Sequence, residues 1–554
     1  MILAFEFNYV SKNALLENML KSICDDFGIS CEIENIDNIV KLYVEGTESI
    51  LTNFSDFIGQ RLPLSIFFKS TAVNVVNSMK ENCRNIEKCL LCVPYTPKTL
   101  SICKEDNLNP LINNEVGIRT FNAKGILLKK GSKTILNTSL GDSFDKLYST
   151  ISDKIQNGEE IYINSTSGAY VIGKIDNLKK KDFIVIPTDL SVVEKMVVIK
   201  DNEIKALASL EKPAIQFRVN TLYGAKEILP TTRVKLKLAD ELLLLNICKK
   251  LNKDDIDFIY RVDTKESTCE YEIQIDGTFN KIPQIEVCVL ENGEILIVNG
   301  DGYSAPFLRE NLKKFDVHAH AQFASIMQEH NLFDAKVSCF YVSKSHDDMI
   351  MHLSEKTGML DLIKFPVIHS VKEIVSIIER SNTGKKLLKN YREKFPQIYT
   401  TAINYKINND VSNSIYTIWG IAAVMLGISN DLEKGSKKIV EFSEDFGGNK
   451  GPRVDYLLVD KKSIKSDFDM IKLIRSAMSF KLAGTDDVTL SFGITEAFTY
   501  FLSDQCDSCI ENFSSEKTLL CGSLFGTQRF TQMVCKNIAA NSKICFNREL
   551  PIDN

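Results

Sequence analysis

The stretch Asp316–His330 reads Asp-Val-His-Ala-His-Ala-Gln-Phe-Ala-Ser-Ile-Met-Gln-Glu-His, in a chain of 554 residues. The chain has 6 histidines, and all of them lie between His318 and His369. Imidazole is the commonest metal ligand in proteins and titrates near neutral pH. This concentration therefore predicts one place where chemistry occurs. The competing interpretation is that a histidine-poor chain clusters its few copies by chance.

On a helix, Asp316 and His320 are four residues apart and lie on one face, about 6 Å from each other. That spacing predicts that the two side chains bind one metal ion, whereas His318 would point elsewhere. Such a site also needs ligands from distant positions, which the segment itself does not identify.

Composition indicates a large globular protein, since 44% of the residues are hydrophobic and 25% are charged. The length predicts about three or four domains. A formal net charge of -5 argues against a general nucleic-acid binder. No stretch reaches the ~18 apolar residues that span a bilayer. Glu6 follows Met1–Phe5 at once and excludes the apolar core of a signal peptide. We therefore expect a cytoplasmic protein with reduced cysteines.

The pattern of apolar residues predicts several structural regions. Residues 1–80 show the order strand, helix, strand, strand, helix, strand, which is the split βαβ pattern. From about residue 118, short β-rich runs alternate with helices, as in an α/β region. Asn292-Gly293 predicts a hairpin turn. Helices are expected to dominate residues 311–440, including a core helix around Trp419.

Gly522 and Ser523 lie in a predicted turn between a strand and a helix. Glycine lets a backbone approach a phosphate, and helix N-termini bind anions. The turn matches neither the P-loop nor the dinucleotide fingerprint. The competing interpretation is an ordinary tight turn.

Cysteines give two further candidate sites. The loop-like stretch 81–115 contains four thiols that are candidates for a structural zinc site, although it lacks the second CxxC of a strong zinc signal. These are Cys83, Cys89, Cys92 and Cys103. Cys506-Asp-Ser-Cys509 is a lone CxxC, for which ordinary buried cysteine is the competing interpretation. Similarly, Lys179–Asp182 is typical of a solvated loop but is also a candidate anion contact.

Taken in order, these features resemble HypF, the carbamoyltransferase that begins cyanide-ligand synthesis for nickel–iron hydrogenases. Residues 316–330 are similar to the family's His-His-His-Ala-His run and its following Ala-Glu-His. Residues 413–427 resemble the family's Ser-Ser-x-Gly-Arg-Leu-Phe-Asp helix, and 519–527 resemble its Leu-Ser-Gly-Gly-Val-Phe-Gln-Asn turn. The segment 548–554 matches its Pro-x-x-Asp. Within the family, the chain looks like the diverged accessory proteins often called HydE.

The resemblance implies a multi-domain protein of α/β and α+β folds. It implies an acylphosphatase-like, ferredoxin-type domain in 1–80, a vestigial zinc-finger segment in 81–115, a YrdC-like α/β domain in 116–269 and a TsaD-like, actin-type ATPase domain in 270–554. It also implies a zinc or iron ion at Asp316, His318, His320 and Asp553, and ATP at Gly522 and Ser523. Asp553 lies near the end of the sequence, where a ligand is expected to be held poorly.

The departures from the family fall on polar, mechanism-bearing positions. Residues 7–14 lack the glycine and arginine of the acylphosphatase loop, so a transferring phosphoryl group has no cationic clamp. Residues 164–170 replace the YrdC-like Lys-Gly-Leu-Gly-Gly stretch, and residues 261–266 lack its Thr-Ser-Gly-Asn motif. In the last domain, Asp316 replaces the first metal histidine and Gly420 replaces an aspartate. The family's nucleotide motifs Asp-Gly-x-Gly and Trp-Gly-Gly-Glu are both absent.

We therefore expect a nickel–iron hydrogenase maturation protein that acts largely by binding HypE-type maturation proteins or the hydrogenase large subunit. The alternative is an active carbamoyltransferase that uses carbamoyl phosphate, ATP and a metal ion. A tRNA-modifying enzyme of the YrdC/TsaD type is a third reading, which the acidic balance and the eroded motifs disfavour.

Overall fold

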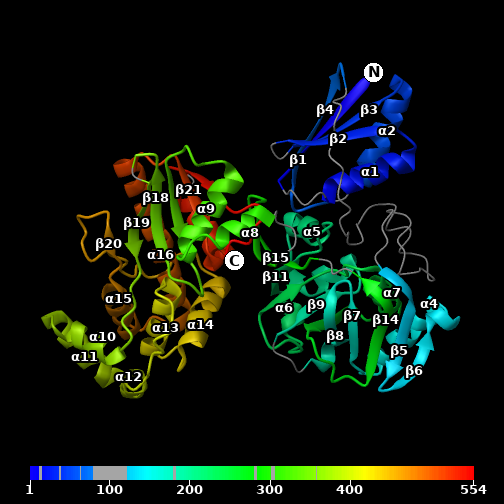
Figure 1. The fold of residues 1–554 in the computed structure, drawn as a ribbon. Helices are drawn as coiled ribbons and strands as arrows, with labels where there is room; N and C mark the ends of the chain where they lie inside the picture. The colour runs from blue at the N-terminus through cyan, green and yellow to red at the C-terminus, as the bar shows by residue number, and fades with distance from the viewer. Residues whose placement is uncertain are drawn as a thin grey trace. The chain divides into compact units, whose positions relative to one another are not determined.

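The computed structural model describes residues 1–10, 15–36, 39–62, 64–78, 121–178, 182–279, 283–300, 306–356, 358–538 and 540–553. The chain forms two compact units (Figure 1). The first comprises 1–289 with 299–305, and the second comprises 290–298 with 306–554. The four predicted zinc cysteines, much of the loop at 7–14 and Lys179–Lys181 lie outside the described residues. Among the described residues, no helix combines the length and apolar character needed to cross a membrane.

The N-terminal part of the first unit is an antiparallel sheet with two helices. Its strand order is β2-β3-β1-β4, which confirms the predicted ferredoxin-type pattern. On α2, Phe54 is fully buried and meets Phe5 of β1 edge-on, with ring centroids 5.6 Å apart. The elements are β1 (Ile2–Tyr9), α1 (Leu15–Phe27), β2 (Cys31–Ile36), β3 (Ile39–Glu45), α2 (Glu48–Arg61) and β4 (Phe68–Val76).

The rest of the first unit is built on a large mixed sheet, which confirms the predicted α/β character. From β15 inward the order is β15-β11-β12-β9-β13-β8-β7-β14-β5-β6. Its strands are β5 (Phe121–Lys130), β6 (Lys133–Asn137), β7 (Ile161–Ser165), β8 (Gly168–Lys174), β9 (Ile184–Pro187), β11 (Ala214–Val219), β12 (Arg233–Leu236), β13 (Phe258–Asp263), β14 (Tyr271–Phe279) and β15 (Ile285–Val289). Two helices, α4 (Phe144–Gln156) and α7 (Leu242–Lys253), share a buried apolar core with it.

One boundary differs from the sequence prediction. Residues 271–279, which we assigned to the TsaD-like domain, form β14, an interior strand of this sheet. The strand pairs antiparallel with β5 and parallel with β7. These partners lie far earlier in the chain, and a local sequence pattern does not reveal them.

The second unit has a sheet of order β20-β19-β18-β17-β21-β22. The strands are β17 (Val337–Tyr341), β18 (Met349–Ser354), β19 (Gly358–Lys364), β20 (Ser466–Asp467), β21 (Lys517–Cys521) and β22 (Lys543–Cys545). The prediction that helices dominate 311–440 is therefore wrong for β17, β18 and β19. All residues of β17 are buried, and periodicity does not distinguish a short buried strand from a buried helix.

Helices make up most of the remaining second unit. They are α8 (Pro306–Leu312), α9 (His318–His330), α10 (Val371–Glu379), α11 (Asn382–Lys394), α12 (Pro396–Ile403), α13 (Ile415–Leu426), α14 (Leu432–Asp445), α15 (Met470–Leu482), α16 (Asp487–Phe513) and α17 (Gln528–Ile538). Trp419 on α13 is fully buried, and its indole N–H donates to Tyr456 Oη over 2.8 Å. The predicted core helix is confirmed.

Candidate metal centre

Helix α9 begins at His318, with Val317 as its extended N-terminal cap. Asp316 precedes the helix and is exposed, so the helical spacing assumed for Asp316 and His320 does not form. His320 instead lies with Nε2 2.8 Å from Asp361 Oδ1 on β19. The side chain expected to point elsewhere, His318, is the one that faces the candidate centre.

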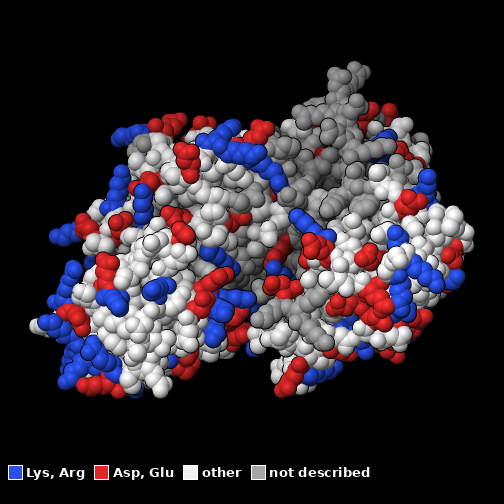
Figure 2. All heavy atoms as spheres, turned by 60° about the horizontal axis from the view of Figure 1, so that its bottom comes forward, with Lys and Arg blue, Asp and Glu red and all other residues white. Residues whose placement is uncertain are grey.

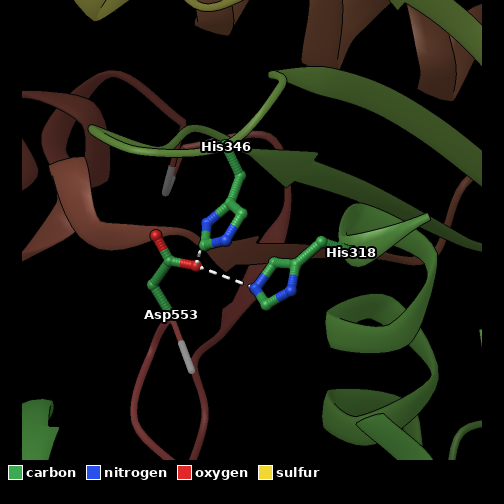
Figure 3. Close-up of side chains that lie close together, drawn as sticks. All are labelled: His318, His346 and Asp553. Atoms are coloured by element: carbon green, nitrogen blue, oxygen red, sulfur yellow. Dashed lines mark hydrogen bonds and ion pairs between the residues drawn. The ribbon is translucent and has the colours of Figure 1, made fainter. Parts of the chain in front are cut away.

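Three side chains from distant parts of the second unit converge (Figure 3). They are His318 at the start of α9, His346 in the loop after β17, and Asp553. Asp553 Oδ1 lies 3.1 Å from His318 Nε2 and 3.5 Å from His346 Nδ1. One ligand atom from each residue lies within 4.8 Å of the other two.

The Asp553 carboxylate is held in its ionised form by hydrogen bonds. Tyr341 Oη donates to Oδ1 over 2.6 Å, and Ser343 Oγ donates to Oδ2 over 2.6 Å. The backbone N–H of Ser523 donates to Oδ2 over 3.0 Å. Burial acts to raise the pKa of Asp553, but these bonds and the contact with His318 outweigh it and hold the pKa well below its ordinary value.

The two imidazoles are stacked, with ring centroids 3.9 Å apart and planes 8° from parallel. Burial, and then the charge of His318, lower the pKa of His346. A neutral imidazole is the form that binds a metal. Asp553 therefore favours its ionised form and His346 its neutral form. These are the forms in which a carboxylate and an imidazole bind a metal ion.

The donor set fits a transition metal. Two imidazole nitrogens and one carboxylate oxygen form the three-ligand set of open zinc sites, and the same donor types suit non-haem iron. Of the four predicted metal ligands, the structure brings His318 and Asp553 together, while Asp316 and His320 lie outside the group.

The backbone next to Asp553 is fixed in place. The N–H of Ile552 donates to the carbonyl of Ile297 over 2.8 Å, and its carbonyl accepts from the N–H of Gly522 over 2.5 Å. The side chains of Leu550 and Ile552 are fully buried. These contacts counter the expectation that a ligand at this position is held poorly.

The predicted phosphate turn supports the same centre. Gly522 has φ +109°, and a Cβ there would lie 2.2 Å from the carbonyl oxygen of Val342. Ser523 gives its N–H to Asp553, and its Oγ accepts from the N–H of Lys344 over 2.8 Å. The groups that we expected to face a phosphate are therefore used within the chain.

Sequence reasoning missed His346, Tyr341 and Ser343 as members of the centre. A signal was present, because polar residues follow the buried run of β17 directly, and His346 belongs to the histidine-rich segment. Strands β17 and β21 are parallel neighbours, with Tyr341 in register with Cys521. Ligands bind beyond the carboxyl ends of such strands, where the following loops converge.

No family model matches the chain. Known proteins nevertheless resemble it in sequence and in fold. Protein HydE of Wolinella succinogenes is 23% identical over 527 residues, which cover 92% of this chain and 91% of that protein. Full-length HypF in its phosphate- and nucleotide-bound form aligns with a TM-score of 0.62 at 12% identity, covering 100% of this chain and 96% of that one. HypF of T. kodakarensis aligns with a TM-score of 0.66 at 11% identity, covering 99% and 96%.

The chain shares the fold of HypF. The predicted resemblance to HypF and HydE and the predicted fold class are confirmed. The phosphate and the nucleotide belong to the solved HypF structure.

The chain has no space for a side chain at residue 420, where the HypF sequence pattern has an aspartate. Gly420, which takes its place on α13, lies against α14. A Cβ at Gly420 would lie 2.5 Å from Ser436 Oγ and 2.6 Å from the carbonyl oxygen of Leu432. Close helix packing therefore fills the space that a side chain would need.

A second polar cluster occupies the first unit, at the stretch that replaces the YrdC-like motif. Glu241, just before α7, is fully buried. It accepts hydrogen bonds from the hydroxyls of Ser165, Thr166 (2.6 Å), Ser167 (3.1 Å) and Tyr170 (2.9 Å). Burial raises the pKa of Glu241. The hydroxyl-rich loop thus surrounds a carboxyl group of the same chain.

One buried cation completes the Glu241 cluster. The guanidinium of Arg261 lies 4.0 Å over the Tyr170 ring and donates to the carbonyl of Ser167 over 2.8 Å. Lys212 is a second buried cation outside this cluster, and its Nζ donates to the Ser209 carbonyl over 2.6 Å. Both cations are almost wholly excluded from water. They interact with groups of the chain itself.

Proposed function

We propose that this HypF-like chain acts in nickel–iron hydrogenase maturation mainly by binding, with little or no carbamoyl transfer. The occupied Glu241 cluster carries the proposal. A buried carboxyl group takes four hydroxyl donors at the position of a family motif. An incoming anionic substrate would have to displace Glu241 and leave it buried without its partners, which costs free energy.

The proposed cofactor is one zinc or iron ion held by His318, His346 and Asp553. Such an ion acts as a Lewis acid when bound. Before a metal ion binds, Asp553 favours its ionised form and His346 its neutral form, because hydrogen bonds lower the pKa of Asp553 and burial lowers the pKa of His346. Metal analysis of protein purified without chelator tests this part. One equivalent of metal is expected, and its absence would contradict the site.

We propose that ATP binds weakly or not at all in the second unit. Ser523 is engaged by Asp553 and Lys344, and Gly420 leaves no room for the missing aspartate. Calorimetry with ATP, in the presence of zinc, is expected to give no saturable heat. A micromolar dissociation constant would contradict this expectation.

The catalytic question has a direct test. The purified chain is incubated with ATP and carbamoyl phosphate, and AMP and pyrophosphate are measured. We expect no formation above the background given by the Asp553→Asn variant. Turnover at an enzyme-like rate would overturn the binding proposal and favour the carbamoyltransferase alternative.

The proposed partners are a HypE-type maturation protein or the hydrogenase large subunit. Figure 2 shows basic and acidic side chains interspersed over much of the face that it draws. A mixed surface suits a protein partner better than a nucleic acid, which favours a continuous basic face. Size-exclusion chromatography of the chain with each purified partner should yield a stable complex with one of them, and elution as separate proteins with both would contradict the proposal.

A further inference from the structure

The C-terminal segment 546–553 is attached to the end of α9 through one carboxylate. Glu329 Oε2 accepts from the N–H of Arg548 over 2.6 Å. Glu329 Oε1 accepts from the N–H groups of Glu549 over 3.2 Å and Leu550 over 2.9 Å. Three consecutive backbone donors thus converge on a single side chain, and hydrogen bonds from N–H groups to a carboxylate are among the stronger ones in proteins.

His330 strengthens this attachment. Its Nε2 donates to the carbonyl of Phe546 over 2.6 Å, and Nη1 of Arg548 donates to the carbonyl of Glu329 over 3.3 Å. The end of α9 therefore contacts the segment through the Glu329 carboxylate, the Glu329 carbonyl and the His330 ring. Three residues beyond Leu550, the same segment delivers Asp553 to the metal centre.

Helix α9 links the attachment to the centre. Its 13 residues span roughly 18 Å at 1.5 Å per residue. His318 lies at its first position and Glu329 at its last but one. One rigid element thus supplies a metal ligand at one end and fixes the segment that carries another ligand at its other end.

We infer that Glu329 is a positioning residue for the metal centre, through its hold on the backbone that presents Asp553. This inference rests on the proposed metal site. It predicts that weakening the attachment lowers metal affinity although Glu329 does not touch the metal ligands. In Glu329→Gln, an amide NH₂ replaces one acceptor and faces a backbone donor, so at least one of the three bonds is lost.

The test uses cobalt(II) with the full chain. Affinity is measured by competition with a chromophoric chelator, and the visible absorption of the bound cobalt reports its geometry. Glu329→Gln should bind about 10- to 100-fold more weakly, the range found for residues that support metal ligands, and its cobalt spectrum should change. Glu310→Gln, the same substitution at an exposed position on α8, should match the unmodified chain.

Hydrogen exchange of the peptide that covers Arg548–Leu550 verifies the attachment itself. It should be faster in Glu329→Gln than in Glu310→Gln. If Glu329→Gln does not fold, Glu329→Asp takes its place, because it keeps the charge but shortens the reach. Unchanged cobalt affinity and spectrum in a folded variant would overturn the positioning role, since a merely structural role lowers only the melting temperature. Failure of the unmodified chain to bind cobalt would instead overturn the metal site itself.

Discussion

The proposed metal centre and the Glu241 cluster both hold a carboxyl group among polar side chains, but they differ in exposure. In the metal centre, the side chain of His346 is 42% exposed and that of His318 is 26% exposed. Glu241 and Arg261 are 1% and 2% exposed. The first group retains access to an ion from solution, whereas the second is satisfied internally. Within this chain, one polar site is open to solvent and the other is part of a core.

Replacing Asp553 by Asn should have the largest effect, and it should act on zinc affinity at the solvent-accessible site. The amide cannot supply the charge that holds a cation between two imidazoles, so zinc affinity should fall by more than about 100-fold, beyond the range for residues that only support ligands. Competition with a fluorescent zinc chelator measures it. Asp361→Asn, which alters the partner of His320 outside the centre, is the control and should change affinity little. Equal loss in both variants would contradict the assigned ligand set.

Replacing Glu241 by Ala should act on stability and leave zinc affinity unchanged. Four hydroxyl donors lose their buried acceptor, and we expect a loss of about 3 kcal/mol in the free energy of unfolding. Urea unfolding followed by circular dichroism measures it. Glu241→Gln keeps one oxygen acceptor and should lose less. An unaltered midpoint in Glu241→Ala would show that the cluster is not a structural core.

Gly420→Ala should have a smaller effect, of about 2 kcal/mol, because the new methyl group meets Ser436 and the Leu432 carbonyl at less than 3 Å. The thermal midpoint reports the loss. Gly59→Ala on α2 is the matched helical control, because nothing lies within 4 Å of the added atom. It should be neutral or stabilise by up to about 1 kcal/mol. An equal change in the thermal midpoint of the two alanine variants would show that α14 moves to accommodate a side chain at residue 420.

The smallest effect concerns pH, because two neighbouring groups act in opposite directions. Burial raises the pKa of Glu329 from 4.5 to about 7, so its contribution to stability is present below pH 4.5 and is lost as pH rises toward 7. Burial lowers the pKa of His330 from 6.5 to about 4, so its contribution is present above pH 6.5 and is lost as pH falls toward 4. The two slopes should largely offset each other.

Variants separate the two contributions. Glu329→Gln should leave only the His330 slope, so that stability rises with pH between about 4 and 6.5. His330→Gln should leave the opposite slope, so that stability falls between about 4.5 and 7. Free energies of unfolding measured at half-unit pH intervals distinguish the three proteins. Identical pH profiles would contradict the assigned shifts.

Local sequence patterns predicted much of the fold but only part of the centre. The strand and helix order of residues 1–80 and the turn at Gly522 follow from periodicity and from glycine placement. His318 and Asp553 were reached through family resemblance. The spacing argument for Asp316 and His320 failed because it assumed a helix that begins two residues too early. The N-terminal boundary of a helix depends on capping and tertiary contacts, which periodicity does not reveal.

His346 and β14 were missed for a related reason. His346 reaches the centre because β17 and β21 pair in parallel across a long stretch of chain. β14 joins β5 and β7 in the same non-local way. Such pairings depend on the whole sheet, and a single sequence carries no direct signal of them.

An ion in the metal centre would act as a reversible cross-link. His318 and Asp553 are 235 residues apart in the chain, and joining them at one point restricts the unfolded ensemble of the intervening segment. Ligand that binds only the folded form adds about 2.7 kcal/mol at a free concentration of 100 times its dissociation constant. The stability of the second unit would then depend on the concentration of free metal ion around it, whereas the stability of the core around Glu241 would not.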